Sequence, residues 1–381
     1  MEWRIFPCDV LFFRGPEPMN AGETQVVSSL FPPAPNVLQG FVRTALLQTM
    51  GASLAEYADA ARSGAMPSPS VAAAVELLGT PRPGDLGKLR LRGPFLLRRR
   101  GDACERLYPA PLDLAPAGED PHADWRGQTP APDMIESDLG VHRHLAAAPP
   151  SEPHWITEKG LGEYLAERPV PAPEVVVEST LAREELRVGI ARDAATHAVR
   201  EQHLYSIGLR RLEDRPVLGC IGLGLRVEGI EPDLELRCAG LHRMGGEGRL
   251  VQLDVAADGG QALLPASPAG GAAALRLVLL TPARWAGGWL PSLQAAGNGW
   301  RADFGAGPVT VVSAVVGKPQ RIGGWDIVNN ASRPAEACVP AGSVFFVEEA
   351  AGMAASLHDS NYGAGANAGF GHIAAGCWTP S

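Results

Sequence analysis

The sequence has little lysine and none of the cysteine pairs that bind zinc or do redox chemistry. Among its 381 residues only Lys88, Lys159 and Lys318 are lysine, so arginine supplies nearly all of the 33 basic side chains. The six cysteines are scattered and form no C-x-x-C pair, so neither a zinc knuckle nor a redox motif is indicated. We therefore expect reduced, mostly buried thiols, no metal site and no other cofactor.

Long hydrophobic runs are also missing. No uninterrupted apolar stretch of about 18 residues occurs, so no membrane-spanning helix is predicted. The N-terminus lacks a basic segment followed by an apolar core, so no secretory signal is expected and a cytoplasmic location is predicted. The net charge is −9, the wrong sign for a protein that coats nucleic acid over its whole surface. A local basic groove remains compatible with this charge, because phosphate attraction depends on the facing surface.

Glycine and proline are plentiful, with 45 and 34 residues, which predicts many loops. Short strands and short helices follow one another without regular β–α alternation, and the long crossover helices of a doubly wound parallel sheet are missing. The predicted fold class is therefore α+β. We expect an N-terminal domain over 1–228, with a weakly periodic surface insertion at about 114–153, and a C-terminal domain over 229–381.

The first fifty residues carry the most informative pattern. An apolar segment with alternating edges, residues 3–13, predicts an opening strand. The prolines of Phe31-Pro-Pro-Ala-Pro35 bar a helix until Asn36, which can cap one. Apolar residues then recur at helical spacing over 38–46, with Arg43 between them. A strand, a proline-fixed loop and a capped helix are expected in this order.

A glycine-rich segment, N-Y-G-A-G-A-N-A-G-F-G-H, occupies residues 361–372. Its glycines allow positive φ and a close approach of the backbone to a ligand. Residues 363–368 match G-x-G-x-x-A, but they lie far from the first β–α turn, and no G-K-[ST] follows, so neither a dinucleotide site nor a P-loop is predicted. Two interpretations remain: a flexible hairpin turn, or a loop whose amides cradle a backbone phosphate.

Residues 188–210 combine cations with aromatic rings, which suit a sugar-phosphate chain with unstacked bases. The side chains concerned are Arg192, Arg200, His203, Tyr205 and Arg210. The alternative is a hairpin whose arginines pair with neighbouring carboxylates. Those carboxylates are Glu184, Glu185, Glu201 and Glu213.

Catalytic motifs are missing from the sequence. It contains no G-x-S-x-G elbow and no H-E-x-x-H helix. His142 and His144 are close in sequence but have no carboxylate or cysteine ligand at a standard spacing. His197 and His203 could act as acid and base in RNA cleavage, but nothing supplies a third partner. We therefore predict that the protein is not an enzyme.

Several motifs together resemble the RAMP superfamily of CRISPR-associated proteins, and more narrowly the third subunit of the Cmr (type III-B) effector complex. The resemblance rests on D-x-L-F-F-R at 9–14, F-P-P-x-P at 31–35, G-x-x-R-T-A-L at 40–46, V-G-I-x-x-D-x-x-T at 188–196, E-x-x-L-Y at 201–205, G-W-D at 324–326, V-P-A-G-S-V at 339–344 and G-F-G at 369–371. The insertion at about 114–153 matches no family motif.

This resemblance implies two ferredoxin-like, RRM-type modules with antiparallel sheets and long insertions. It implies a non-catalytic subunit that holds the 5′ tag of the guide RNA, docks the large palm-domain subunit and neighbours the backbone RAMP subunit. The alternatives are a RAMP endoribonuclease that processes precursor guide RNA, or the equivalent subunit of a related type III complex. The residues expected to contact RNA are Arg43, Arg192, Arg200, His203, Tyr205, Arg210, Gly363, Gly365, Gly369, Phe370 and Gly371.

Overall fold

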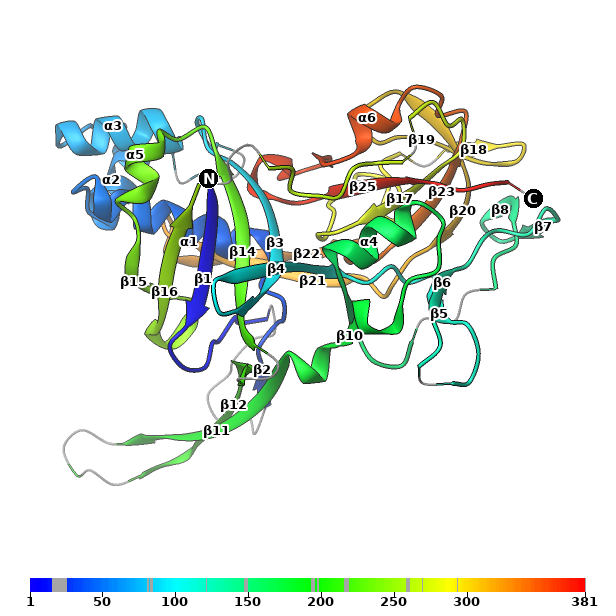
Figure 1. The fold of residues 1–381 in the computed structure, drawn as a ribbon. Coiled ribbons are helices and arrows are strands. Elements are labelled where there is room, and N and C mark those ends of the chain that lie inside the picture. Colours follow the sequence, from blue (N-terminus) through cyan, green and yellow to red (C-terminus); the bar gives the residue numbers. More distant parts are fainter. Residues whose placement is uncertain are drawn as a thin grey trace.

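The computed structural model divides the chain between two large sheets, one holding the N-terminus and the other the C-terminus (Figure 1). It describes residues 1–15, 26–80, 82, 85–120, 122–146, 150–192, 196, 199–215, 219–257, 261–268, 270–292 and 294–380; for residue 26 and the strand residues within 190–205 it describes the backbone alone. In this part of the chain no helix is long and apolar enough to cross a membrane. Strands pair almost throughout in antiparallel fashion among short helices, which confirms the predicted α+β class.

The first sheet has nine strands in the order β10-β9-β4-β3-β14-β1-β16-β15, with β13 paired to β14. Its strands are β1 (Glu2–Pro7), β3 (Arg90–Arg100), β4 (Ala103–Pro109), β9 (His154–Thr157), β10 (Val175–Val177), β13 (Asp214–Arg215), β14 (Gly219–Glu228), β15 (Gly240–Met244) and β16 (Arg249–Ala256). Strand β1 lies between β14 and β16. The predicted domain boundary at 228/229 stays a prediction, but β15 and β16 follow it in sequence and belong to the sheet of β1.

Helices cover one face of this sheet (Figure 1). They are α1 (Pro35–Thr49), α2 (Leu54–Ser63), α3 (Pro69–Leu78) and α5 (Pro232–Leu236). The predicted opening helix is confirmed, but its predicted cap is wrong: Ala34 is the N-cap and Pro35 occupies the first turn. Asn36 lies inside the helix, where its Nδ2 donates to the carbonyl of Gly323 at 2.7 Å. A proline preset to helical φ can start the helix without a side-chain cap.

The second sheet has seven antiparallel strands in the order β18-β19-β20-β23-β17-β25-β24. They are β17 (Leu275–Leu279), β18 (Gln294–Ala296), β19 (Gly299–Asp303), β20 (Pro308–Val315), β23 (Val344–Glu348), β24 (Ser360–Asn361) and β25 (His372–Cys377). The remaining helices are α4 (Glu158–Leu165), α6 (Ala354–Leu357) and the 3-10 turns η1 (Ala172–Glu174), η2 (Glu178–Thr180), η3 (Gly246–Gly248) and η4 (Ala366–Ala368).

A shared apolar cluster joins the two sheets. Phe95 and Tyr108 from the first sheet, Leu161 from α4 and Phe346 from the second sheet are all buried in it. Each such side chain stabilises the fold by about 1.5–3 kcal/mol relative to an exposed one. The halves therefore pack against each other through a common core.

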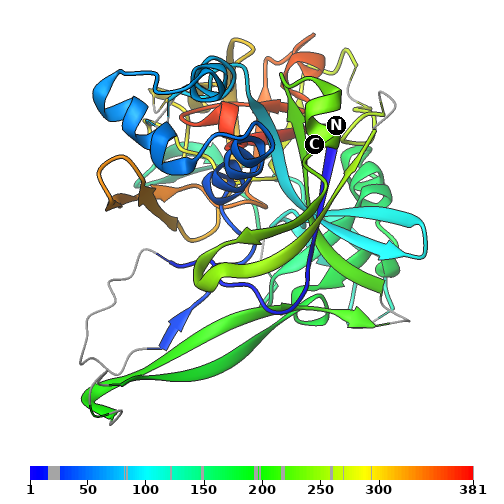
Figure 2. The same ribbon diagram turned by 90° about the vertical axis from the view of Figure 1, so that its left-hand side faces the viewer.

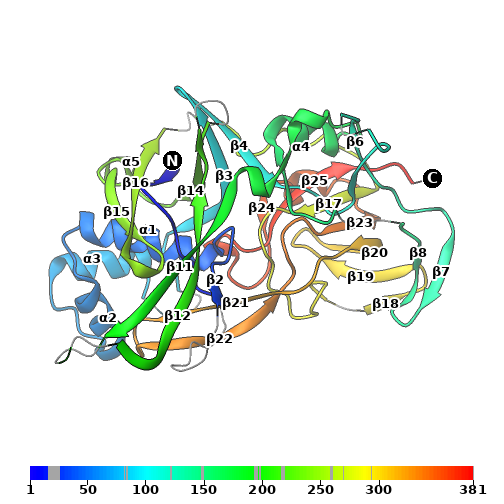
Figure 3. The same cartoon turned by 90° about the horizontal axis from the view of Figure 1, so that it is seen from below.

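Two hairpins lie outside the main sheets. The first, β11 (Ala182–Arg192) and β12 (Val199–Leu212), pairs with β2 (Val26–Ser28) and projects from the body (Figure 2). The second, β21 (Gln320–Asp326) and β22 (Ala331–Cys338), runs from the C-terminal half beneath the helices of the N-terminal half (Figure 3). At its tip the carbonyl of Val328 accepts a hydrogen bond from Arg62 of α2 at 2.7 Å. This hairpin thus bridges the two halves.

The segment expected as an insertion forms two small hairpins. They are β5 (Leu114–Pro116) with β6 (Trp125–Gly127), and β7 (Met134–Ser137) with β8 (Gly140–Arg143). Arg143 pairs with Glu348 of the second sheet at 2.8 Å, and Trp300 Nε1 donates to the carbonyl of Leu139 at 2.9 Å. These contacts fasten the second hairpin to the C-terminal half.

Candidate nucleic-acid interface

A groove of about 650 Å³ lies between α1, the β21–β22 hairpin and the glycine-rich loop. Four arginines line it, together with the carboxylates of Asp326 and Glu336. The arginines are Arg43, Arg82, Arg284 and Arg333. We call this cavity the arginine groove. A second cavity of about 370 Å³ shares Asn36, Gln39, Arg43 and Arg333 with it and continues along α1 to Trp325.

Arg43 is held by the fold itself. Its Nη2 donates to the carbonyls of Leu78 at 2.9 Å and Thr80 at 3.3 Å, and also to that of Asp85. Burial lowers the pKa of this guanidinium, although the negative charge of Asp85 acts in the opposite direction. Arg43 therefore fixes the loop that follows α3, and its contact with RNA stays a prediction.

Arg82, Arg284 and Arg333 are the groove arginines that the sequence did not predict. The Arg284 guanidinium stacks 3.9 Å from the ring centroid of Phe370, and its Nε lies 3.2 Å from a carboxylate oxygen of Glu336. Arg333 makes no hydrogen bond or ion pair within the part of the chain that the structure describes, and its Nε is buried without a partner there. A guanidinium left unpaired in a groove is available to an anion.

The glycine-rich loop forms the opposite wall of the arginine groove, to which Gly363 and Gly365 contribute. These two glycines have φ of +109° and +78°, and Gly369 and Gly371 have φ of +102° and +67°. The positive φ expected from the sequence is thus confirmed. A Cβ at Gly369 would lie 2.5 Å from the carbonyl oxygen of Gly93, and one at Gly371 would collide with the carbonyl of Tyr362. The last two glycines are therefore required by packing within the chain.

Phe370 does not face the solvent. Its side chain is 1% exposed and packs with Ala34, Leu86 and Ile322 in a small apolar cluster. One face of the ring packs against the Arg284 guanidinium, so that face is not free to stack on a base. The predicted contact of Phe370 with RNA therefore stays a prediction, and the burial of the ring does not support it.

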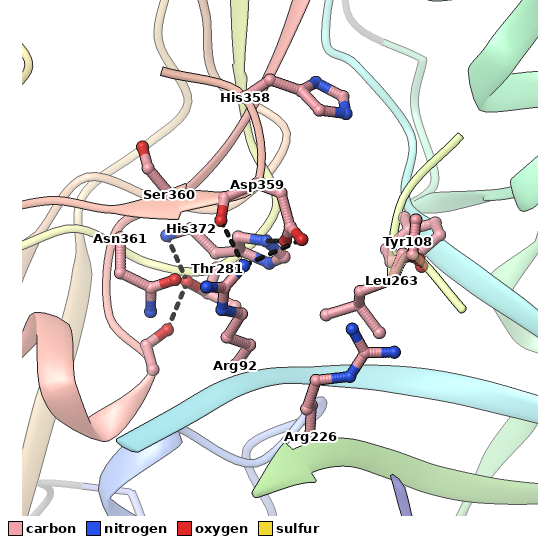
Figure 4. Close-up of polar contacts among 12 residues, drawn as sticks. Arg92, Tyr108, Arg226, Leu263, Thr281, His358, Asp359, Ser360, Asn361 and His372 are labelled. Carbon is pink, nitrogen blue, oxygen red and sulfur yellow. Dashed lines mark hydrogen bonds and ion pairs between the residues drawn. The ribbon is translucent and has the colours of Figure 1, made fainter. Parts of the chain in front are cut away.

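A partly buried polar network fixes the base of this loop (Figure 4). The Oδ1 of Asp359 accepts from His372 Nε2 at 2.8 Å, and its Oδ2 pairs with Arg92 of β3 at 2.8 Å. Burial alone would raise the pKa of Asp359, but its hydrogen bond to His372 and the Arg92 charge together lower it. Thr281 accepts from the His372 amide at 2.9 Å and donates to the carbonyl of Gly369 at 2.6 Å. The network ties the loop to the first sheet.

The projecting hairpin carries the other expected RNA contacts. Arg210 lies partly buried on β12, with its guanidinium 5.9 Å from the centroid of the Phe31 ring. The backbones of Arg192, on β11, and of Arg200, His203 and Tyr205, on β12, lie in these strands. The side chains of those four residues lie outside what the structure describes, so these predictions stay open.

Ion pairs account for several other arginines of this hairpin. Arg211 and Arg187 bind Glu185 at 2.6 Å and 2.7 Å, and Arg183 pairs with Glu213. The alternative weighed from the sequence, pairing with carboxylates, therefore explains these three. The structure brings Arg43, Gly363 and Gly365 together at the arginine groove and leaves Arg210 elsewhere.

Of the histidines considered for catalysis, the structure describes the side chains of His142 and His144 but not those of His197 and His203. His142 stacks on Trp300 with 5.1 Å between ring centroids, and His197 lies outside the described residues. His372, which the sequence reasoning did not select, has a carboxylate partner but is only 1% exposed. Among the described residues no three histidine, cysteine or carboxylate side chains gather as a metal site requires.

Comparison with known proteins identifies one matching family model, described as CRISPR-associated protein (Cas_Cmr3), over residues 3–378. The chain is similar to one in a cryo-EM structure of the Type III-B Cmr-beta bound to cognate target RNA, with 16% identity, a TM-score of 0.50 and coverage of 91% of this chain and 86% of that one. A structure of Cmr-beta with target RNA and AMPPnP, state 1, gives 15% identity, a TM-score of 0.49 and the same coverage of 91% and 86%. No curated protein matches. At 16% identity the likeness concerns the fold alone.

Proposed function

The chain belongs to the Cas_Cmr3 family of CRISPR-associated proteins, and on this premise we propose that it is a non-catalytic, RNA-binding subunit of a type III-B effector complex. The resemblance to the third Cmr subunit expected from the sequence motifs is thereby confirmed. Its proposed task is to hold the 5′ tag of the guide RNA. Its proposed partners are the large palm-domain subunit and the backbone RAMP subunit. The related structure of 0.50 TM-score, described as a complex bound to target RNA, supports membership of such an assembly.

Strand order supports the proposal of two ferredoxin-like modules. In the first sheet β16-β1-β14-β3 lie side by side, and in the second β25-β17-β23-β20 do. Numbered along the chain, each set has the spatial order 4-1-3-2 of a βαββαβ sheet, the plan of the RRM. Helix α1 supplies the crossover between β1 and β3 in the first set. With this assignment the first module extends through β16, beyond residue 228.

The observation that carries the proposed RNA binding is the arginine groove. The chain as a whole is acidic, with a net charge of −9, yet four arginines face two carboxylates in this cavity. Local charge, and not net charge, sets the attraction for phosphate. Arg333, without a partner among the described residues, and the adjoining backbone of the glycine-rich loop both suit a phosphate chain.

A binding and cleavage assay on the full chain tests this function. The protein is incubated with end-labelled RNA that carries the repeat-derived tag, with and without EDTA. We expect saturable binding that falls with salt, and intact RNA in both conditions. Cleavage at one position would favour the endoribonuclease alternative, with His203 or His197 as catalyst. Absence of binding to any tag-bearing RNA would overturn the proposal.

A further inference from the structure

A further cavity, of about 710 Å³ and distinct from the two described above, opens between the two halves. Both cavities reach strand β21: Gln320 lines this cavity, and Ile322 lines the arginine groove. We call it the tryptophan pocket, after Trp125 and Trp155 in its wall. Its volume lies within the range of about 300–1,000 Å³ that is typical of sites for small ligands.

Aromatic rings form part of its wall, and prolines supply much of the rest. Phe31 and Trp155 lie 6.3 Å apart between ring centroids, and Trp125 lies 5.0 Å from His154. Trp125 is only partly buried, whereas Trp155 belongs to the core. Such rings are the surfaces on which proteins stack bases that have left a nucleic-acid stack.

A small number of polar groups accompany the rings. Trp155 Nε1 donates to Glu178 Oε2 at 3.2 Å, while Oε1 has no hydrogen-bond partner among the described residues. Lys318, one of the three lysines of the chain, is an exposed member of the lining. The apolar walls suit the flat face of a base, and Glu178 can accept a hydrogen bond from an exocyclic amino group. Lys318, at the outer side, suits the phosphate of the same nucleotide.

We propose that the tryptophan pocket receives one unstacked base with an exocyclic amino group, from the RNA that lies in the arginine groove. The base stacks on the aromatic wall at Trp125, and its exocyclic amino group donates to Glu178. This inference rests on the proposed function and deepens it. The groove holds the phosphate chain, which carries no sequence information, and the pocket reads one base.

An abasic scan tests this inference. The affinity of the full chain is measured for tag-bearing RNAs in which one nucleotide at a time lacks its base. We expect one position, occupied by a base with an exocyclic amino group, at which the loss weakens wild-type binding by about fivefold or more, as the removal of a stacked base should. With Trp125→Ala, binding of intact RNA weakens and the sensitivity at that position disappears. Trp289→Ala, a partly buried tryptophan beside Trp300 in the second sheet, serves as the matched control and should leave the scan unchanged.

Glu178→Gln provides a second readout that keeps the ring wall intact. At the sensitive position the amino-bearing base is exchanged for the analogue without its amino group. Wild type should lose affinity on this exchange, and Glu178→Gln should be less affected by it. A scan without a sensitive position, or equal sensitivity in wild type and Trp125→Ala, would overturn the base pocket while leaving groove binding intact. Failure of wild type to bind RNA at all would overturn both.

Discussion

The guanidinium of Arg284 lies 3.9 Å from the centroid of the Phe370 ring, and this contact explains the phenylalanine of the G-F-G motif. The ring is buried, so it positions an arginine at the groove and has no face free for a base. Stacking on an aromatic ring also keeps the guanidinium edge free for hydrogen bonds.

Phe370→Ala should therefore destabilise the protein. Loss of a buried phenylalanine ring costs about 3–5 kcal/mol in free energy of unfolding, because a cavity remains. Trp325→Ala is the control: that ring is 51% exposed, and its loss should cost less than about 1 kcal/mol. Urea denaturation measures both, and equal costs for the two variants would show that Phe370 is not a core residue.

The glycines of the loop allow a comparison at matched backbone conformation. Gly371 and Gly352 have φ of +67° and +77°, but an added Cβ is blocked only at Gly371. Gly352→Ala should cost about 1–2 kcal/mol for the left-handed backbone alone. Gly371→Ala should cost clearly more, because Tyr362 must also move. Thermal unfolding of the two variants measures the difference, and a smaller loss for Gly371→Ala would contradict the packing described here.

Asp113 should make stability depend on pH. Burial raises its pKa to about 6, while its Oδ1 accepts from the Tyr164 hydroxyl at 2.6 Å. The unfolded chain has an ordinary carboxyl pKa of about 3.9, so folding favours the protonated form of Asp113. The free energy of unfolding therefore falls as pH rises from about 4 to about 6, because the buried carboxyl must then lose its proton. The loss between about pH 4 and 6 should be on the order of 3 kcal/mol.

Asp113→Asn should remove this pH dependence, because the amide has a similar shape and does not titrate. Chemical denaturation at several pH values between 3.5 and about 7 gives the slope for both proteins. A slope of stability against pH that is the same in wild type and in Asp113→Asn would show that Asp113 does not titrate in this window.

Local elements could be predicted from sequence, because their signals are local. The opening helix and the positive φ of the glycine-rich loop follow from helical spacing and glycine content, and alternation predicts the opening strand, although that strand ends at Pro7 and not at residue 13. Arg43 shows where this reasoning stops. Its spacing places it between apolar helix positions, but its burial comes from carbonyls of the loop after α3, which no helical pattern reveals.

The arginine groove could not be predicted from the sequence because distant segments build it. Arg284 and Arg333 follow α1 by more than 230 residues and reach it only through the second sheet and the β21–β22 hairpin. The pairing of β16 with β1 also joins distant segments of the chain, and it places residues after 228 in the first sheet. Arg333 had one sequence signal, because it lies in a segment with family motifs such as G-W-D, whereas Arg284 lies outside every motif segment.

The salt dependence of RNA affinity tests the central claim most directly. The arginine to change is Arg333, because it makes no hydrogen bond or ion pair in the described part of the chain, so its loss breaks neither. Arg301, which is 41% exposed and paired with Glu349 on the second sheet, provides the matched control. Arg333→Ala should weaken binding and flatten the slope of log affinity against log salt by about one, and Arg301→Ala should leave both unchanged. An affinity that ignores salt, or an Arg333→Ala slope equal to that of wild type, would contradict RNA binding in this groove.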